Sequence, residues 1–175
     1  YGEGFDLEAA PTRLQALIMF IRVLGEEEQA LAWSGTTPFK DIEKGSQAEH
    51  YVGYAYEKGY TNGYTATSFK PVGAVNAYQY TEFVLRAMGY SSAANKDLSD
   101  TLLRAVNAGV LTDGDAAMLQ SAAFLRAQLV YISYYALEAD LPDGSQSLAD
   151  RLMDLGVFTR DEWRGSWKLV KSDRL

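Results

Sequence analysis

Apolar residues recur along the chain at the spacing of one helix face, and they do so in three segments. In residues 12–25 the spacing is i, i+3, i+4, i+7 and i+10, which is typical of an amphipathic helix. The positions are Leu14, Leu17, Ile18, Ile21 and Leu24. Residues 77–89 follow a similar pattern, and residues 120–138 are apolar on nearly every side. We therefore predict long helices near 12–25, 77–89 and 120–138, of which the third is the most buried.

The residues at the predicted helix starts are not equivalent. Thr12 and Asn76 carry side-chain oxygens that accept hydrogen bonds from free N–H groups of a first helical turn, so both are suitable N-caps. Leu125, at the matching position, has no such acceptor. We therefore expect the third long helix to begin earlier, near Ser121.

Three shorter apolar stripes each end at a glycine, namely Gly59, Gly109 and Gly156. A glycine just after a helical stripe is the usual C-terminal stop. This predicts short helices near 47–59, 98–109 and 147–156. The chain then alternates long and short helices three times.

The three long segments align without a gap as copies of one unit. Each copy has a Gln near its start, at Gln15, Gln79 and Gln128, and the residue seven positions later is Arg22, Arg86 or Tyr135. A unit of this size cannot bury its apolar face alone and must pack against its copies. We therefore predict one mostly α-helical domain over residues 1–160, with its function in the grooves between units, and a C-terminal tail over 161–175.

Composition narrows the possible partners. The 175 residues are 47% hydrophobic and 22% charged, as in folded soluble proteins, and the net charge is −7. An acidic chain has no general affinity for nucleic acid or anionic membranes, and no apolar run is long enough for membrane insertion. The absence of Cys excludes disulfides and thiolate metal sites. Since the chain begins at Tyr1 without an initiator Met, we expect a processed protein or a fragment.

The middle of the chain resembles the S-layer homology (SLH) family. The resemblance lies in Phe39-Lys40-Asp41-Ile42, in the helical run 48–55, and in the loop residues Gly59, Gly63, Phe69 and Pro71. Thr12-Arg13-Leu14-Gln15 is similar to the family's Thr-Arg-Ala-Gln helix opening, and Arg126-Ala127-Gln128 is similar to the same opening without its Thr. Residues 4–11 look like the end of another such loop.

This resemblance implies a pseudo-threefold assembly of three helix-loop-helix repeats around a central helical bundle. It also implies a non-catalytic anchoring module, located outside the cell at a bacterial cell wall or S-layer. The expected partner is a pyruvylated secondary cell-wall polysaccharide, bound in the grooves between repeats.

Several positions depart from the family's pattern. Gln47 stands where the family has Trp, Ala77 where it has Arg, and Leu125 where it has Thr. These departures put at least one groove in doubt as a binding site. The alternative function is therefore a degenerate scaffold for protein–protein docking with other surface proteins.

The chemistry of the expected ligand selects the candidate cations. A pyruvate ketal presents a carboxylate, and an Arg in the first turn of a helix adds a forked cation to the free N–H groups there. Arg13 is the first candidate and Arg126 the second. The alternative is that each Arg pairs with an acidic residue of the neighbouring repeat.

Other residues are candidates for binding the ligand beside these two arginines. We expect Asp41, Gln15 and Gln128 to orient groove loops or to accept hydrogen bonds from sugar hydroxyls. Tyr64 lies in the loop and presents an aromatic ring for stacking against a sugar. Trp33 fits either stacking or internal packing.

The sequence marks no catalytic or metal site. His50 is the only His, and no Cys or second His accompanies it, so we expect no metal and no cofactor. The Asp113-Gly114-Asp115 stretch lacks the further ligands of a calcium loop and is interpreted as a turn. A wall-active hydrolase would need a pair of carboxylates in one cleft, and no spacing marks such a pair.

Overall fold

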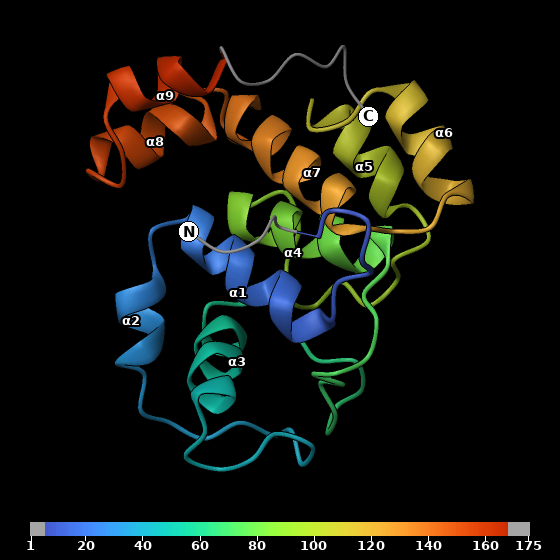
Figure 1. Ribbon diagram of the computed structural model, residues 1–175, viewed down its shortest axis with the longest axis vertical. Helices are drawn as coiled ribbons and strands as arrows, with labels where there is room; N and C mark the ends of the chain where they lie inside the picture. Colours follow the sequence, from blue (N-terminus) through green and yellow to red (C-terminus); the bar gives the residue numbers. More distant parts are fainter. Residues whose placement is uncertain (1–5, 168–175) are drawn as a thin grey trace.

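The computed structural model describes residues 6–167, and all regular secondary structure in that range is helical (Figure 1). The helices are α1 (Arg13–Val23), α2 (Glu27–Leu31), α3 (Gln47–Glu57), α4 (Ala77–Met88), α5 (Thr101–Asn107), α6 (Asp113–Ser121), α7 (Arg126–Glu138), α8 (Leu148–Asp154) and α9 (Arg160–Trp167). The predicted mostly α-helical class is confirmed. No helix of the described range is both long and apolar enough to cross a bilayer. Residues 1–5 of the predicted domain and 168–175 of the predicted tail lie outside that range.

The three long helices α1, α4 and α7 contact one another in pairs and cross the middle of the molecule (Figure 1). Tyr80 of α4 lies between the other two helices. Its ring meets Phe20 of α1 edge-on at 6.1 Å, and its hydroxyl shares a 2.5 Å hydrogen bond with Ser133 of α7. Full burial of each such aromatic or aliphatic side chain stabilises the fold by about 1.5–3 kcal/mol.

Each long helix packs against a helix that comes later in the chain. The predicted alternation of long and short helices is wrong for the first unit, because α1 and α3 both have 11 residues and α2 lies between them in the chain. α3 lies on α1, α5 on α4 and α8 on α7. Val157, just after α8, also covers Gly25 at the end of α1, where an added Cβ would lie 2.6 Å from its methyl carbons. The last unit therefore closes against the first.

The loop before one long helix docks on the start of another. Arg13 and Leu14 donate their backbone N–H groups to the carbonyl oxygens of Gly73 and Pro71, at 2.9 and 3.1 Å. Residues 126 and 127, at the start of α7, bond in the same way to the carbonyl oxygens of residues 9 and 7, both at 3.0 Å. In both cases the accepting residues lie three and five positions before the N-cap of the next helix, Thr12 or Asn76. Two junctions are thus built alike, while the pseudo-threefold relation and the single-domain extent 1–160 stay predictions.

The expected start of the third long helix is wrong. Residues 113–121 form a separate helix, α6, and α7 begins at Arg126 with Leu125 as its N-cap residue. The side-chain oxygen of Gln128 accepts the Leu125 N–H at 2.9 Å, so the helix is capped from inside. The turn predicted at 113–115 is also wrong, since Thr112 caps these residues as the first turn of α6.

The most buried long helix is α4, and the prediction for α7 is wrong. Buried positions of α4 include the polar residues Thr81, Glu82 and Arg86, whereas Val130 of α7 is exposed. A polar residue is buried where partners surround it, and apolar periodicity cannot reveal those partners.

The described part of the tail forms α9 and packs back on the body. Trp163 lies 5.5 Å from the ring centre of Tyr134 in α7 and 6.0 Å from that of Phe158. This contact places α9 beside α8 and the end of α7 (Figure 1).

Candidate functional site

A pocket of about 230 Å³ lies where the start of α1, the loop after α3 and the middle of α4 meet. Its lining comprises Arg13, loop residues 62–66, Gln79, Glu82, Phe83 and Arg86 of α4, and Lys96 and Leu98 of the following segment. We call it the Arg13 pocket. The α4 residues line it because they follow the i, i+3, i+4, i+7 spacing of one helix face.

Arg13 is buried, with 3% of its surface exposed, and forms no ion pair with a carboxylate of residues 6–167. Its Nε donates to the carbonyl oxygen of Phe69 at 2.8 Å. Its guanidinium carbon lies 4.9, 5.4 and 5.8 Å from the ring centres of Phe69, Phe83 and Tyr64. Neither Nη group bonds to any residue of the described range. Burial against aromatic faces thus orients a cation whose Nη donors have no partner among the described residues.

The pKa of Arg13 is lowered to about 10, because burial and, to a smaller extent, the nearby Arg86 lower it more than Tyr64 and Asp41 raise it. The guanidinium is therefore still charged at neutral pH. It also has more to gain from an anionic partner than an exposed Arg has, because desolvation weakens its hydration.

The loop that closes the pocket has a fixed shape. Gly63 has a φ of +89°, and a Cβ there would lie 2.4 Å from the ring of Phe39. Tyr64 follows it and is 49% exposed, with the Nζ of Lys70 3.7 Å from its ring centre. One face of the predicted stacking ring is therefore already occupied by a cation.

Asp41 supports this loop from outside the pocket. Its carboxylate accepts hydrogen bonds from the backbone N–H groups of Phe69 at 2.9 Å and Lys70 at 2.8 Å, and from the Ser68 hydroxyl at 2.7 Å. Burial raises the pKa of the Asp41 carboxyl, but these hydrogen bonds outweigh it and the net pKa is lowered. Asp41 fixes the carbonyl group that holds Arg13.

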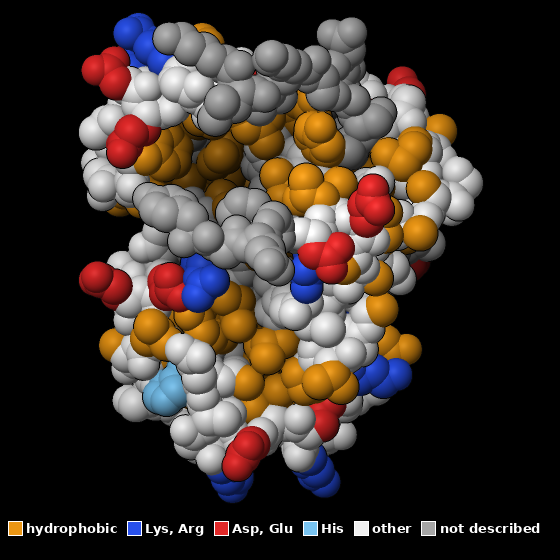
Figure 2. Space-filling model, viewed as in Figure 1, with side chains coloured by type: hydrophobic (Ala, Val, Ile, Leu, Met, Phe, Trp, Pro, Cys, Tyr) orange, Lys and Arg blue, Asp and Glu red, His pale blue; other side chains and the backbone are white. Residues whose placement is uncertain are grey.

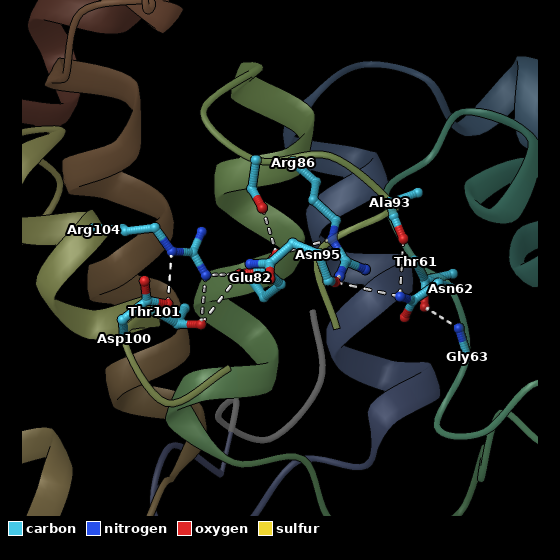
Figure 3. Close-up of polar contacts among 11 residues, drawn as sticks. Thr61, Asn62, Gly63, Glu82, Arg86, Ala93, Asn95, Asp100, Thr101 and Arg104 are labelled. Atoms are coloured by element: carbon cyan, nitrogen blue, oxygen red, sulfur yellow. Dashed lines mark hydrogen bonds and ion pairs between the residues drawn. The ribbon is translucent and has the colours of Figure 1, made fainter. Parts of the chain in front are cut away.

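A buried ion network borders the pocket (Figure 3). Glu82, 2% exposed, accepts from Arg86 Nε at 3.0 Å and from Arg104 Nη2 at 2.7 Å. It also accepts from the hydroxyls of Ser91 at 2.6 Å and Thr101 at 3.1 Å. Arg104 also pairs through Nε with the carboxylate of Asp100 at 3.0 Å, so the network holds two carboxylates for two guanidinium groups.

The Arg13 pocket carries excess positive charge. Arg13, Arg86 and Lys96 line it, against the single carboxylate of Glu82. Elsewhere, charged side chains of both signs are scattered over the face seen in Figure 2. The cations in the pocket are a local concentration on an acidic protein, and they favour an anionic ligand.

The second candidate cation lies at the junction of α7 and α1. Arg126 donates from Nη2 to the side-chain oxygen of Gln15 at 3.4 Å, and its Nη1 lies 4.0 Å from Asp6. Gln15 also accepts the Thr12 N–H at 3.1 Å. The approach to Asp6 partly agrees with the alternative prediction, in which Arg126 pairs with an acidic residue. Gln15 and Gln128 each cap the helix to which they belong.

The structure brings Arg13 and Tyr64 together, places Asp41 behind them, and keeps Arg126, Gln15 and Gln128 away from the pocket. Sequence reasoning missed Arg86 and Gln79 as pocket residues. Their seven-residue separation was visible in the repeat, but only the packing of α4 shows which way that face points.

Trp33 and His50 belong to the packing of α3. The Trp33 indole donates to Glu57 at 2.8 Å and lies against Gly53, and the His50 ring bonds to the Trp33 carbonyl oxygen at 2.6 Å. Within residues 6–167, no group of His, Asp and Glu side chains is arranged to hold a metal ion.

Comparison with known proteins identifies a family that part of the chain resembles. Residues 38–76, which contain α3 and the loop up to the N-cap of α4, match the S-layer homology domain. The resemblance to that family is therefore confirmed for this segment, and domains of that family suggest anchoring at a cell surface.

A cell surface protein of Thermoanaerobacter kivui is 29% identical over 170 residues, covering 91% of this chain and 21% of the relative. The chain thus spans about a fifth of the length of that relative. No solved structure matches the chain.

Proposed function

We propose that this chain is a non-catalytic module that anchors a bacterial surface protein by binding a pyruvylated secondary cell-wall polysaccharide. The Arg13 pocket takes a carboxylate of the glycan. The observation that supports this most directly is the buried guanidinium of Arg13, whose Nη groups bond to no residue of the described range. A carboxylate accepts two parallel N–H bonds from such a fork.

The surroundings support the same ligand. Arg86 and Lys96 add positive charge, and the part-exposed Tyr64 lies at the pocket with Lys70 against its ring. The matched segment 38–76 supplies the loop that closes the pocket.

The test is binding of the purified chain to wall polysaccharide before and after chemical removal of pyruvate, measured by titration calorimetry. We expect depyruvylation to weaken binding by at least about tenfold, the effect of losing one charge-assisted contact. Equal affinity for both preparations would refute the proposal.

A second candidate is a protein-docking scaffold in a surface assembly. Ala77 stands at the start of α4, where the family has an Arg. In addition, the large apolar side chains of Leu103 and Leu155 are 60% and 67% exposed. Binding to purified S-layer protein free of polysaccharide, together with no binding to the glycan, would favour this function.

A further inference from the structure

Three Gln side chains occupy the same position in the long helices, and two of them serve the fold. The side-chain oxygen of Gln15 accepts the N-cap N–H of α1 at 3.1 Å, and that of Gln128 accepts the N-cap N–H of α7 at 2.9 Å. Gln15 accepts Arg126 as well. These two amides are used internally.

Gln79 is different. Its backbone N–H bonds to the side chain of Asn76 at 2.9 Å, but its side-chain oxygen is buried without a partner. Neither terminal atom of its amide bonds to any residue of the described range. The side chain lines the Arg13 pocket instead. A buried amide without a partner destabilises the free protein, so a ligand that satisfies it gains affinity.

The same pocket holds a second guanidinium. Arg86 bonds to Glu82 through Nε and to the Asn95 carbonyl oxygen through Nη2 at 2.6 Å, and its Nη1 has no partner in the described range. Arg13 and Arg86 reach the pocket from different helices, and the charge of Arg86 disfavours that of Arg13 until an anion lies between them. The ligand carboxylate therefore has donors on two sides.

We infer that Gln79 is a specificity-determining residue, which binds a hydroxyl next to the carboxylate of the glycan. The terminal torsion of a Gln side chain is soft, so its amide oxygen turns toward a ligand donor without movement of α4. This inference rests on the proposed function and adds a requirement to it: the ligand presents a carboxylate and a neighbouring O–H donor.

The junction of α7 and α1 shows why this assignment is specific to one site. There the equivalent Arg126 and Gln15 bond to each other, so that pair is already satisfied. In the Arg13 pocket the corresponding groups, Arg13 and Gln79, make no such bond. Arg13 and Gln79 are therefore the pair whose polar groups are available to a ligand.

The test uses a methyl hexopyranoside that carries a pyruvate ketal and a free hydroxyl on the neighbouring ring carbon, and the same compound with that hydroxyl O-methylated. We expect the wild-type chain to prefer the free hydroxyl by about tenfold, as for one hydrogen bond to a buried group. Gln79→Met, which keeps the length but removes the amide, loses this preference while still binding the ketal. Gln15→Met is the matched control and keeps it.

An undiminished preference in Gln79→Met, with an unchanged melting curve, would overturn the role of Gln79 alone. Failure of the wild-type chain to bind either sugar or the wall polysaccharide would instead overturn the proposed function, and this inference with it. The two failures are therefore distinguishable.

Discussion

The guanidinium of Arg13 is tied to the carbonyl oxygen of Phe69, 56 residues further along the chain, by a 2.8 Å hydrogen bond from Nε. This bond joins the first turn of α1 to the loop that matches the S-layer homology family. It leaves the Nη groups of Arg13 without a partner among residues 6–167, in a pocket that Arg86 and Lys96 also line. The cation proposed to bind the ligand is therefore positioned by a loop far from it in the chain.

Replacement of Arg13 tests this positioning. We expect Arg13→Lys to weaken binding of the pyruvylated polysaccharide by at least about tenfold, because Lys keeps the charge but loses the fork. Arg126→Ala is the matched control, since Arg126 holds the same place in α7 but bonds to Gln15, and it should change affinity by less than about twofold. Titration of both variants checks this, and equal losses would show that Arg13 has no special role.

Asp41 makes the loop sensitive to acid. Its pKa is lowered in the folded state by hydrogen bonds that outweigh burial, so its stabilising effect is fully present above its ordinary pKa and is lost as pH falls through the lowered value. We expect Asp41→Asn to lower Tm by roughly 2–5 °C at neutral pH. The difference should shrink below about pH 4.

Thermal unfolding across a pH series measures this effect, with the exposed neighbour Glu43→Gln as control. A gap between wild type and Asp41→Asn that stays constant down to pH about 2 would contradict an ionised carboxylate as its source.

The buried network around Glu82 predicts a large stability loss. Glu82→Ala leaves the guanidinium groups of Arg86 and Arg104 without their shared carboxylate, so we expect a decrease of about 3–5 kcal/mol in the free energy of unfolding. The exposed Glu28→Ala should change it by less than about 0.5 kcal/mol. Urea denaturation measures both, and similar values for the two variants would exclude a structural role of the network.

Gly53 is the position where α3 tolerates no side chain. A Cβ there would lie 2.2 Å from the Trp33 ring, so Gly53→Ala should displace the indole and destabilise the fold by about 1–3 kcal/mol, against the helix propensity of Ala. The loss of the Trp33–Glu57 bond should shift the indole N–H resonance of Trp33 in an NMR spectrum.

Gly114→Ala in α6 is the matched control for Gly53→Ala. The nearest atom to its Cβ would be the Thr112 hydroxyl oxygen at 3.7 Å, so the substitution should be neutral or stabilising. Destabilisation of equal size in both variants would argue against Trp33 as the cause.

Helix content was the most predictable part of this protein. The predicted segments 12–25, 47–59 and 77–89 correspond to α1, α3 and α4, since apolar spacing and N-caps such as Thr12 and Asn76 act within a few residues. The start of α7 was not predictable from Leu125, because its cap comes from the side chain of Gln128 inside the helix.

The candidate site was only partly predictable. The family motif pointed first to Arg13, but it also pointed to Arg126 and Gln15, which bond to each other. Arg86 lies seven positions after the repeated Gln, as Arg22 does, which marked it as a repeated position. The sequence could not show that it is buried, because a buried Arg and a solvated Arg are the same letter.

The sequence by itself determined the helical class, the repeated unit and the acidic composition, because periodicity and charge are properties of the chain read in order. Only the tertiary structure decided that Arg13 and Arg86 share one pocket while Arg126 is paired with Gln15. The physical reason is that the use of a polar group depends on its partners. Those partners come from helices and loops far away in the chain.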